Sequence, residues 1–153
     1  MRPEKHVLLA GALGGVGFLS TRSTSVAVAT FLAGVVVDGD HLVDYAIYWK
    51  SKGGRPPLKE LINGSMFRQW GKFGICLHSY ELLLPLWALA LISDSITLVS
   101  WVSFSFVVHL ISDQISYPLH PLIYFFTFRL NKRFEFASLV ASQGVTKEHA
   151  GEL

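Results

Sequence analysis

The chain has 153 residues, of which 51% are hydrophobic and 16% are charged, and its net charge is +2. This length suits one domain, and the charged fraction is well below the ~25% of average soluble domains. These values exclude a disordered chain and a basic nucleic-acid-binding tail, and the single cysteine, Cys76, excludes an intrachain disulfide scaffold. With a mean hydropathy of +0.42, the composition predicts a small membrane protein.

The first apolar block covers about residues 6–19 and is short for a membrane span, which needs ~20 residues. Arg2 and Lys5 before it would also fit the basic flank of a signal peptide. No convincing small-x-small cleavage site follows, and Gly11 and Gly15 form a pair typical of close helix packing. We therefore expect an uncleaved first span.

Three further apolar blocks are expected to be spans, at about residues 25–49, 73–93 and 96–117. An amphipathic stretch at 58–71 and an aromatic segment with a basic end at 122–134 are typical of helices lying in the membrane interface. The predicted fold is an all-α integral membrane bundle of about four transmembrane helices plus interfacial helices. We expect one domain over residues 1–136 and a flexible polar cytoplasmic tail over 137–153.

The basic residues predict the orientation of this bundle. With the N-terminus inside, twelve of the thirteen Lys and Arg residues are cytoplasmic, and only Arg22 falls in an outer loop. Both termini of this inner-membrane protein are therefore expected in the cytoplasm. At 1.5 Å per helical residue, Asp40, His78 and His109 then each lie about 8–13 Å below the cytoplasmic interface. Three polar clusters from different segments are thus predicted to lie at one level.

The first cluster places three carboxylates and an imidazole within seven residues: Asp38, Asp40, His41 and Asp44. On a helix, Asp40 and Asp44 share a face. Carboxylates this close repel one another unless a cation or protons intervene. The alternative is a helix end whose acids are solvated in the headgroup region, but apolar sequence flanks the cluster on both sides. A metal ion is the simplest neutraliser.

The other two clusters are His78 with Glu81, three residues apart, and His109 with Asp113, four residues apart. Each pair would share one face of a helix. A lone His in a span is more often a hydrogen-bonded packing residue, but ionisable pairs inside membrane segments indicate function. The His109–Asp113 pair can chelate one ion, or its carboxylate can orient the imidazole.

These clusters lead to specific site assignments. We expect the metal ligands to be Asp38, Asp40, His41, His78, His109 and Asp113, holding one or two ions, of which zinc fits best and manganese or iron also fit. Glu81 or Asp44 is the expected general base. Arg68, Lys72 and Arg129 are candidates for holding an anionic headgroup, although topology and anionic-lipid contact explain them equally well. Cys76, His6, His120 and His149 are not expected to be ligands.

The order of these motifs resembles a known family. DGDH at 38–41, HS at 78–79 and HLISD at 109–113 are similar to elements of bacterial and archaeal LexA-regulated, membrane-bound, metal-dependent hydrolases. The resemblance covers about residues 30–120. Leu77 replaces the family's threonine, and residues 67–70 are only a loose counterpart of its basic run. The resemblance implies a hydrolase whose helical metal site is related to those of zinc-dependent phospholipase C and P1-type nucleases.

The leading hypothesis is a metal-dependent hydrolase that acts on an ester or phosphoester at the cytoplasmic leaflet. A site ~10 Å below the interface suits a membrane lipid as substrate better than a soluble nucleotide, and no nucleic-acid partner is expected. A non-enzymatic metal-binding or metal-transporting membrane protein is the alternative. A metal that only ties helices together would need fewer ligands than the sequence offers. A homo-oligomer stays open.

Overall fold

The computed structural model describes residues 3–117 and 119–140, and the regular elements in these ranges are helices. Two isolated β-bridges, Lys72–Glu135 and Leu119–Val140, also occur there. The all-α prediction is therefore confirmed. The helices, with two 3-10 turns η1 and η2, are α1 (Pro3–Thr21), α2 (Thr24–Val36), η1 (Val37–Gly39), α3 (Asp40–Lys52), α4 (Leu58–Ile62), α5 (Ser65–Trp70), η2 (Tyr80–Leu82), α6 (Leu83–Ser93), α7 (Ile96–Ser116), α8 (Phe126–Asn131) and α9 (Phe136–Leu139).

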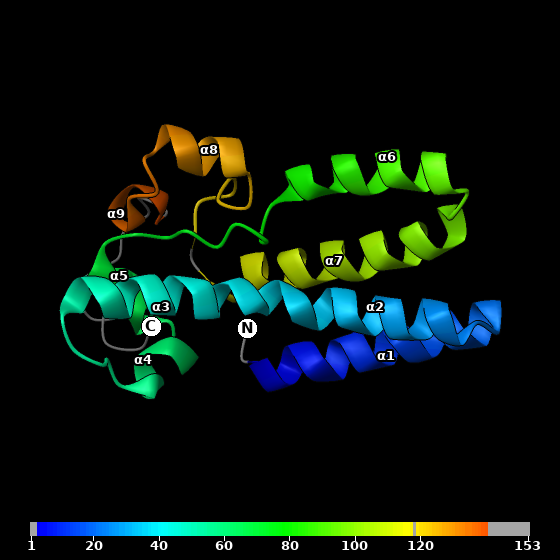
Figure 1. Ribbon diagram of the computed structural model, residues 1–153, viewed down its shortest axis with the longest axis horizontal. Helices are drawn as coiled ribbons and strands as arrows, with labels where there is room; N and C mark the ends of the chain where they lie inside the picture. The colour runs from blue at the N-terminus through cyan, green and yellow to red at the C-terminus, as the bar shows by residue number, and fades with distance from the viewer. Residues whose placement is uncertain (1–2, 118, 141–153) are drawn as a thin grey trace.

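The helices form two halves along one long axis (Figure 1). The long helices α1, α2, α6 and α7 make up one half, and α2 continues through η1 into α3 as one rod that reaches the other half. There α3 is joined by the short helices α4, α5, α8 and α9, which we call the cap. The N-terminal end of α1 lies near the middle of the molecule, where the two halves meet.

Two helices are long and apolar enough to cross a membrane, namely Thr24–Lys52 with 29 residues and Ile96–Ser116 with 21 residues. Tyr80–Ser93 is apolar but shorter. Length and composition make the two long helices candidate membrane spans, and the four spans expected from the sequence are not shown.

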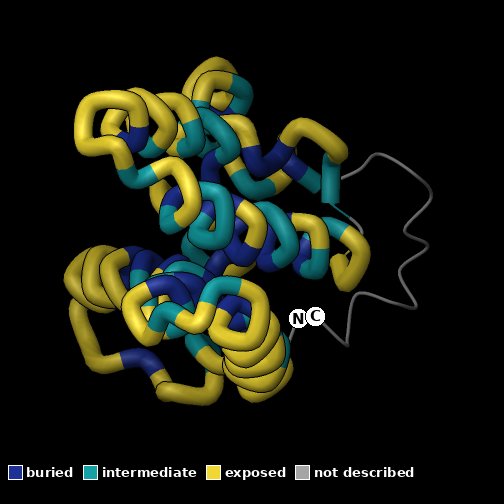
Figure 2. The backbone as a smooth tube through the Cα atoms, turned by 90° about the vertical axis from the view of Figure 1, so that its right-hand side faces the viewer, coloured by how far each residue is buried: buried dark blue, intermediate teal, exposed yellow. Residues whose placement is uncertain are grey.

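Apolar side chains are distributed differently in the two halves. The buried hydrophobic core lies largely in the cap and includes Tyr48, Met66 and Phe67. In the other half, large apolar side chains face outward, and Leu8, Leu84 and Ile92 are more than 70% exposed. Figure 2 shows buried backbone near the centre and exposed backbone around the outer helix faces. Large contiguous apolar surfaces mark contact with an apolar partner or a membrane.

The expected continuous span over residues 73–93 is wrong in its first part. Residues 71–79 are not helical, and the helical segment begins at Tyr80. Gly71 ends α5 in the left-handed conformation, with φ of +73°. The backbone N–H groups of Gly74 and Ile75, which a helix would use internally, are bound instead by the Asp44 carboxylate at 3.0 and 2.9 Å. His78 and Glu81 therefore do not share a helix face.

The packed part of the chain extends slightly beyond the expected domain boundary at residue 136. Helix α9 runs to Leu139, whose side chain is fully buried in the core. The rest of the expected polar tail, residues 141–153, lies outside the described residues.

Candidate metal centre

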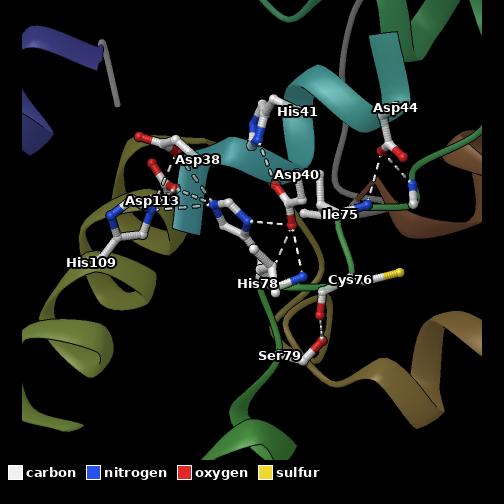
Figure 3. A network of polar contacts seen from close by, with 12 residues as sticks. Asp38, Asp40, His41, Asp44, Ile75, Cys76, His78, Ser79, His109 and Asp113 are labelled. Carbon is white, nitrogen blue, oxygen red and sulfur yellow. Dashed lines mark hydrogen bonds and ion pairs between the residues drawn. The ribbon is translucent and has the colours of Figure 1, made fainter. Parts of the chain in front are cut away.

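Four side-chain atoms from three separate segments meet where the two halves join (Figure 3). Asp38 comes from η1, His78 from the loop 71–79, and His109 and Asp113 from one face of α7. His109 Nε2 lies 3.2 Å from His78 Nε2, 3.4 Å from Asp38 Oδ1 and 3.4 Å from Asp113 Oδ2. His78 Nε2 lies 3.6 Å from each of the same two carboxylate oxygens. We call these four atoms the ligand frame.

The ligand frame has the dimensions of a metal coordination shell. In tetrahedral sites with metal–ligand bonds of about 2.0–2.1 Å, neighbouring ligand atoms lie about 3.3–3.4 Å apart. The five of the frame's six distances that involve an imidazole nitrogen, 3.2–3.6 Å, bracket that value. Two imidazoles and two carboxylates are also a common donor set for divalent metals. Among the described residues, His6, Asp38, His109 and Asp113 form one group that could hold a metal ion, and Asp38, His41 and His78 form a second. The ligand frame takes its members from both groups.

Hydrogen bonds on the far sides of both imidazoles direct their Nε2 atoms into the frame. His109 Nδ1 lies 2.8 Å from the carbonyl oxygen of Gly34, to which it must donate because a carbonyl only accepts. Gly34 lies in the last turn of α2, where carbonyl groups leave the α-helical pattern. His78 Nδ1 lies 3.1 Å from Asp40 Oδ2. Each Nε2 thereby faces the frame, where it can bind a cation once its proton is released, as is typical of metal-binding histidines.

The carboxylates around His78 also favour a positive charge at this point. Burial opposes the charged form of His78, but hydrogen bonds to Asp113, Asp38 and Asp40 outweigh it and raise the pKa of His78 to about 10. The same negative surroundings attract a divalent cation.

Asp40 orients histidines and is not placed as a ligand, contrary to the expectation. Its Oδ2 accepts the backbone N–H groups of Leu77 and His78 at 2.8 and 3.3 Å, in addition to His78 Nδ1. Its Oδ1 accepts Nδ1–H of His41 at 2.9 Å. Asp40 therefore fixes both the loop that carries His78 and the rings of His78 and His41.

The two expected general bases bind backbone groups. Asp44 anchors the loop at Gly74 and Ile75. Glu81 accepts the N–H groups of Phe126 and Thr127 at 2.9 and 3.0 Å and the Thr127 hydroxyl at 2.9 Å, which caps the start of α8. Neither carboxylate belongs to the groups that could hold a metal ion among the described residues. The shared helix face of Asp40 and Asp44 is used to hold the loop 71–79.

His41 lies at the open edge of the site. It could join Asp38 and His78 around an ion, since one ligand atom of each lies within 4.8 Å of the others. The side chains of His41 and Asp38 are 28% and 29% exposed, whereas those of His78, His109 and Asp113 are at most 7% exposed. Solvent or substrate would therefore reach the site past His41 and Asp38.

His6 is a site residue that the sequence reasoning missed. Its Nε2 lies 3.0 Å from Asp113 Oδ1, and its ring stacks on His109 with 4.0 Å between centroids. It is not among the ligands expected from the sequence. The depth argument applied to the other clusters would have found it, because His6 lies about 22 Å before the end of α1 at Thr21, and His109 lies about 20 Å after the start of α7 at Ile96.

The three basic residues expected at the mouth have different environments. Arg129 is fully buried, and burial lowers the pKa of its guanidinium. It donates to the carbonyls of His78 and Ile123 at 2.8 and 3.0 Å and to Ser79 Oγ at 2.6 Å, so it supports the His78 loop from behind. Lys72 donates to the Arg133 carbonyl, and Arg68 is exposed. The headgroup role expected for Arg129 is therefore wrong.

Among the described residues, Cys76 and His120 do not join the site. Cys76 is exposed, and His120 stacks on Phe128 in the cap. His149 lies outside the described residues.

Comparisons with protein-family models, curated proteins and solved structures found no match.

Proposed function

We propose that this protein is a membrane-embedded, metal-dependent hydrolase that cleaves an ester or phosphoester bond, with a membrane lipid as substrate. The observation that carries the proposal is the ligand frame, in which two imidazole nitrogens and two carboxylate oxygens lie at the spacing of one divalent-ion site. Zinc fits this donor set best, and manganese or iron are the alternatives. The resemblance of the motifs to membrane-bound, metal-dependent hydrolases supports the same assignment.

The depth of the frame supports a lipid substrate. The turns at 22–23 and 94–95 lie at the same end of the molecule (Figure 1). Ser23, Asp94 and Ser95 of these turns line one pocket of about 500 Å³. Asp38 and His109 lie about 20 Å from that end, counted along α2 and α7. In a hydrocarbon core of ~30 Å this leaves about 10 Å to the opposite interface. The distribution of basic residues makes that interface the cytoplasmic one, with both termini on the same side.

The chain's own residues would divide the work of hydrolysis as follows. Asp38, His78, His109 and Asp113 would hold the ion, and a bound ion would supply Lewis-acid activation of water and of the substrate oxygen. His41, at the open edge, holds its Nδ1–H on Asp40, so its Nε2 is the atom available to accept a proton. We assign the general base to His41 in place of Glu81 and Asp44, whose oxygens bind backbone groups.

One observation favours the alternative, a protein that binds or conducts a metal ion. Thr30, Ser103 and Ser105 are buried in α2 and α7 on the side of the frame toward the turns at 22–23 and 94–95, and their hydroxyls have no hydrogen-bond partner. Buried polar groups of this kind usually bind ordered water. A hydrated path through this half would suit an ion conductor.

A lipid-hydrolysis assay separates the two functions. Purified protein would be loaded with Zn²⁺ and mixed with phosphatidylethanolamine–phosphatidylglycerol vesicles, and released headgroups and fatty acids would be measured by mass spectrometry. A hydrolase is expected to release one of these products, and His41→Asn is expected to lower the rate about 100-fold or more, as loss of a general base does. The matched control is His120→Asn, a histidine in the cap. Stoichiometric Zn²⁺ binding without product release would contradict the hydrolase proposal and favour the alternative.

A further inference from the structure

Helix α1 contributes one buried imidazole to the metal centre. The His6 side chain is 3% exposed, Nε2 lies 3.0 Å from Asp113 Oδ1, and the ring plane is 27° from that of His109. The ionised carboxylate only accepts hydrogen bonds, so His6 Nε2 must carry the proton that is shared with Asp113.

The two oxygens of Asp113 face different partners. Oδ2 belongs to the ligand frame, 3.4 Å from His109 Nε2 and 3.6 Å from His78 Nε2, and Oδ1 faces His6. A donor on Oδ1 restricts rotation of the carboxylate and holds Oδ2 toward the frame. Such hydrogen bonds to metal-binding carboxylates orient the ligand and tune its affinity.

Close packing of α1 against α2 sets the position of His6. Ala10, one turn after His6, lies so near α2 that a Cβ on Gly34 would be 2.7 Å from the Ala10 Cβ. A Cβ on Gly14, one turn further along α1, would be 2.9 Å from the Ala27 carbonyl oxygen. Both glycines let the two helices approach, and the register of α1 then brings His6 beside Asp113 and His109.

We propose that His6 is a positioning residue of the metal centre, which fixes Asp113 as a ligand without itself binding the ion. This inference rests on the proposed function, because it assumes that the ligand frame holds a metal. It makes α1 part of the site, so that the centre is built from α1, η1, the loop 71–79 and α7.

Three substitutions at position 6 of the full chain test this role. His6→Leu removes the donor, His6→Asn carries an amide that is too short to reach Asp113, and His6→Gln places an amide N–H near the position of Nε2. Zinc affinity would be measured by competition with a chromogenic chelator in detergent. His6→Leu and His6→Asn are expected to bind Zn²⁺ 10–100-fold more weakly, and His6→Gln to stay within about threefold of the wild type. His120→Leu and His120→Gln serve as matched controls.

X-ray absorption of the zinc-loaded proteins provides a measure that a merely structural residue would not change. Two imidazole ligands are expected in the wild type and in His6→Gln. Wild-type affinity in both His6→Leu and His6→Asn would overturn the inference. Loss of affinity in His6→Gln together with one fewer imidazole would also overturn it, since His6 would then be a ligand. Metal binding with the expected pattern but without lipid hydrolysis would refute the proposed enzyme and leave the role of His6 standing.

Discussion

Replacing Asp40 by alanine tests how the chain orients its metal-binding histidines. The substitution removes one carboxylate that accepts four N–H groups, two of them on the buried residue His78. Each buried donor left without a partner costs about 1–3 kcal/mol. His78 also loses the group that holds its Nδ1–H, and such losses weaken metal binding by about 10–100-fold.

Asp44→Ala is the matched control for Asp40→Ala. Both carboxylates lie on one face of α3, both are 5% exposed, and both accept backbone N–H groups of the loop 71–79. Asp44 contacts Gly74 and Ile75, whereas Asp40 also contacts the imidazoles of His78 and His41. Both variants are expected to lower the melting temperature of the metal-free protein by circular dichroism. Only Asp40→Ala is expected to weaken Zn²⁺ binding by about 10–100-fold.

The assay is Zn²⁺ competition with a chromogenic chelator in detergent, with the wild type and both variants measured side by side. Equal zinc affinities of the two variants would refute the reasoning. In that case Asp40 would act on the metal only through the stability of the loop, and its contacts with the two imidazoles would have no separate effect.

Three further predictions concern the packing around the site. Gly34→Ala is expected to destabilise the protein by about 1–3 kcal/mol in a thermal melt, because the new Cβ would lie 2.7 Å from the Ala10 Cβ and 2.8 Å from Ser105 Oγ. Gly11→Ala is the control and is expected to be neutral in the same melt, because its new Cβ meets open space. Arg129→Met leaves the carbonyls of His78 and Ile123 without their donor, so the free energy of unfolding is expected to fall by about 2–4 kcal/mol in chemical denaturation. A fall no larger than that of the exposed Lys59→Met would contradict this prediction. Glu81→Gln is expected to lower the free energy of unfolding by about 0.5–2 kcal/mol, because it weakens the cap of α8. Its rate of lipid hydrolysis is expected to stay within about threefold of the wild-type rate. Abolished hydrolysis in a folded variant would instead assign the general base to Glu81.

The approach of the polar clusters could be predicted from the sequence because it depends on helix geometry. His109 and Asp113 are four residues apart on α7, and counting residues from the cytoplasmic interface predicts Asp40, His78 and His109 at one level. The prediction needed only the helical rise and the assumption that apolar blocks span the same layer. The structure brings the carboxylates of Asp38 and Asp113 to 3.4 Å from His109 Nε2.

The roles within the cluster could not be predicted from the sequence, because they depend on a loop. The sequence predicts a helical span from about residue 73, and such a helix would put His78 and Glu81 on one face. The loop instead offers its N–H groups to Asp40 and Asp44, which turns two expected functional carboxylates into anchors. The sequence predicts Arg129 as a candidate headgroup contact, because sequence alone does not show that its guanidinium donates to backbone carbonyls.

The metal centre is tested most directly by the zinc content of the purified protein after loading with Zn²⁺ and gel filtration. Zinc would be measured by mass spectrometry in the wild type and in single alanine variants of Asp38, His78 and His109. About one ion per chain is expected in the wild type and in the control Asp44→Ala, and little or no retained zinc is expected in the three ligand variants. Stoichiometric zinc in all three ligand variants, or none in the wild type, would contradict this expectation.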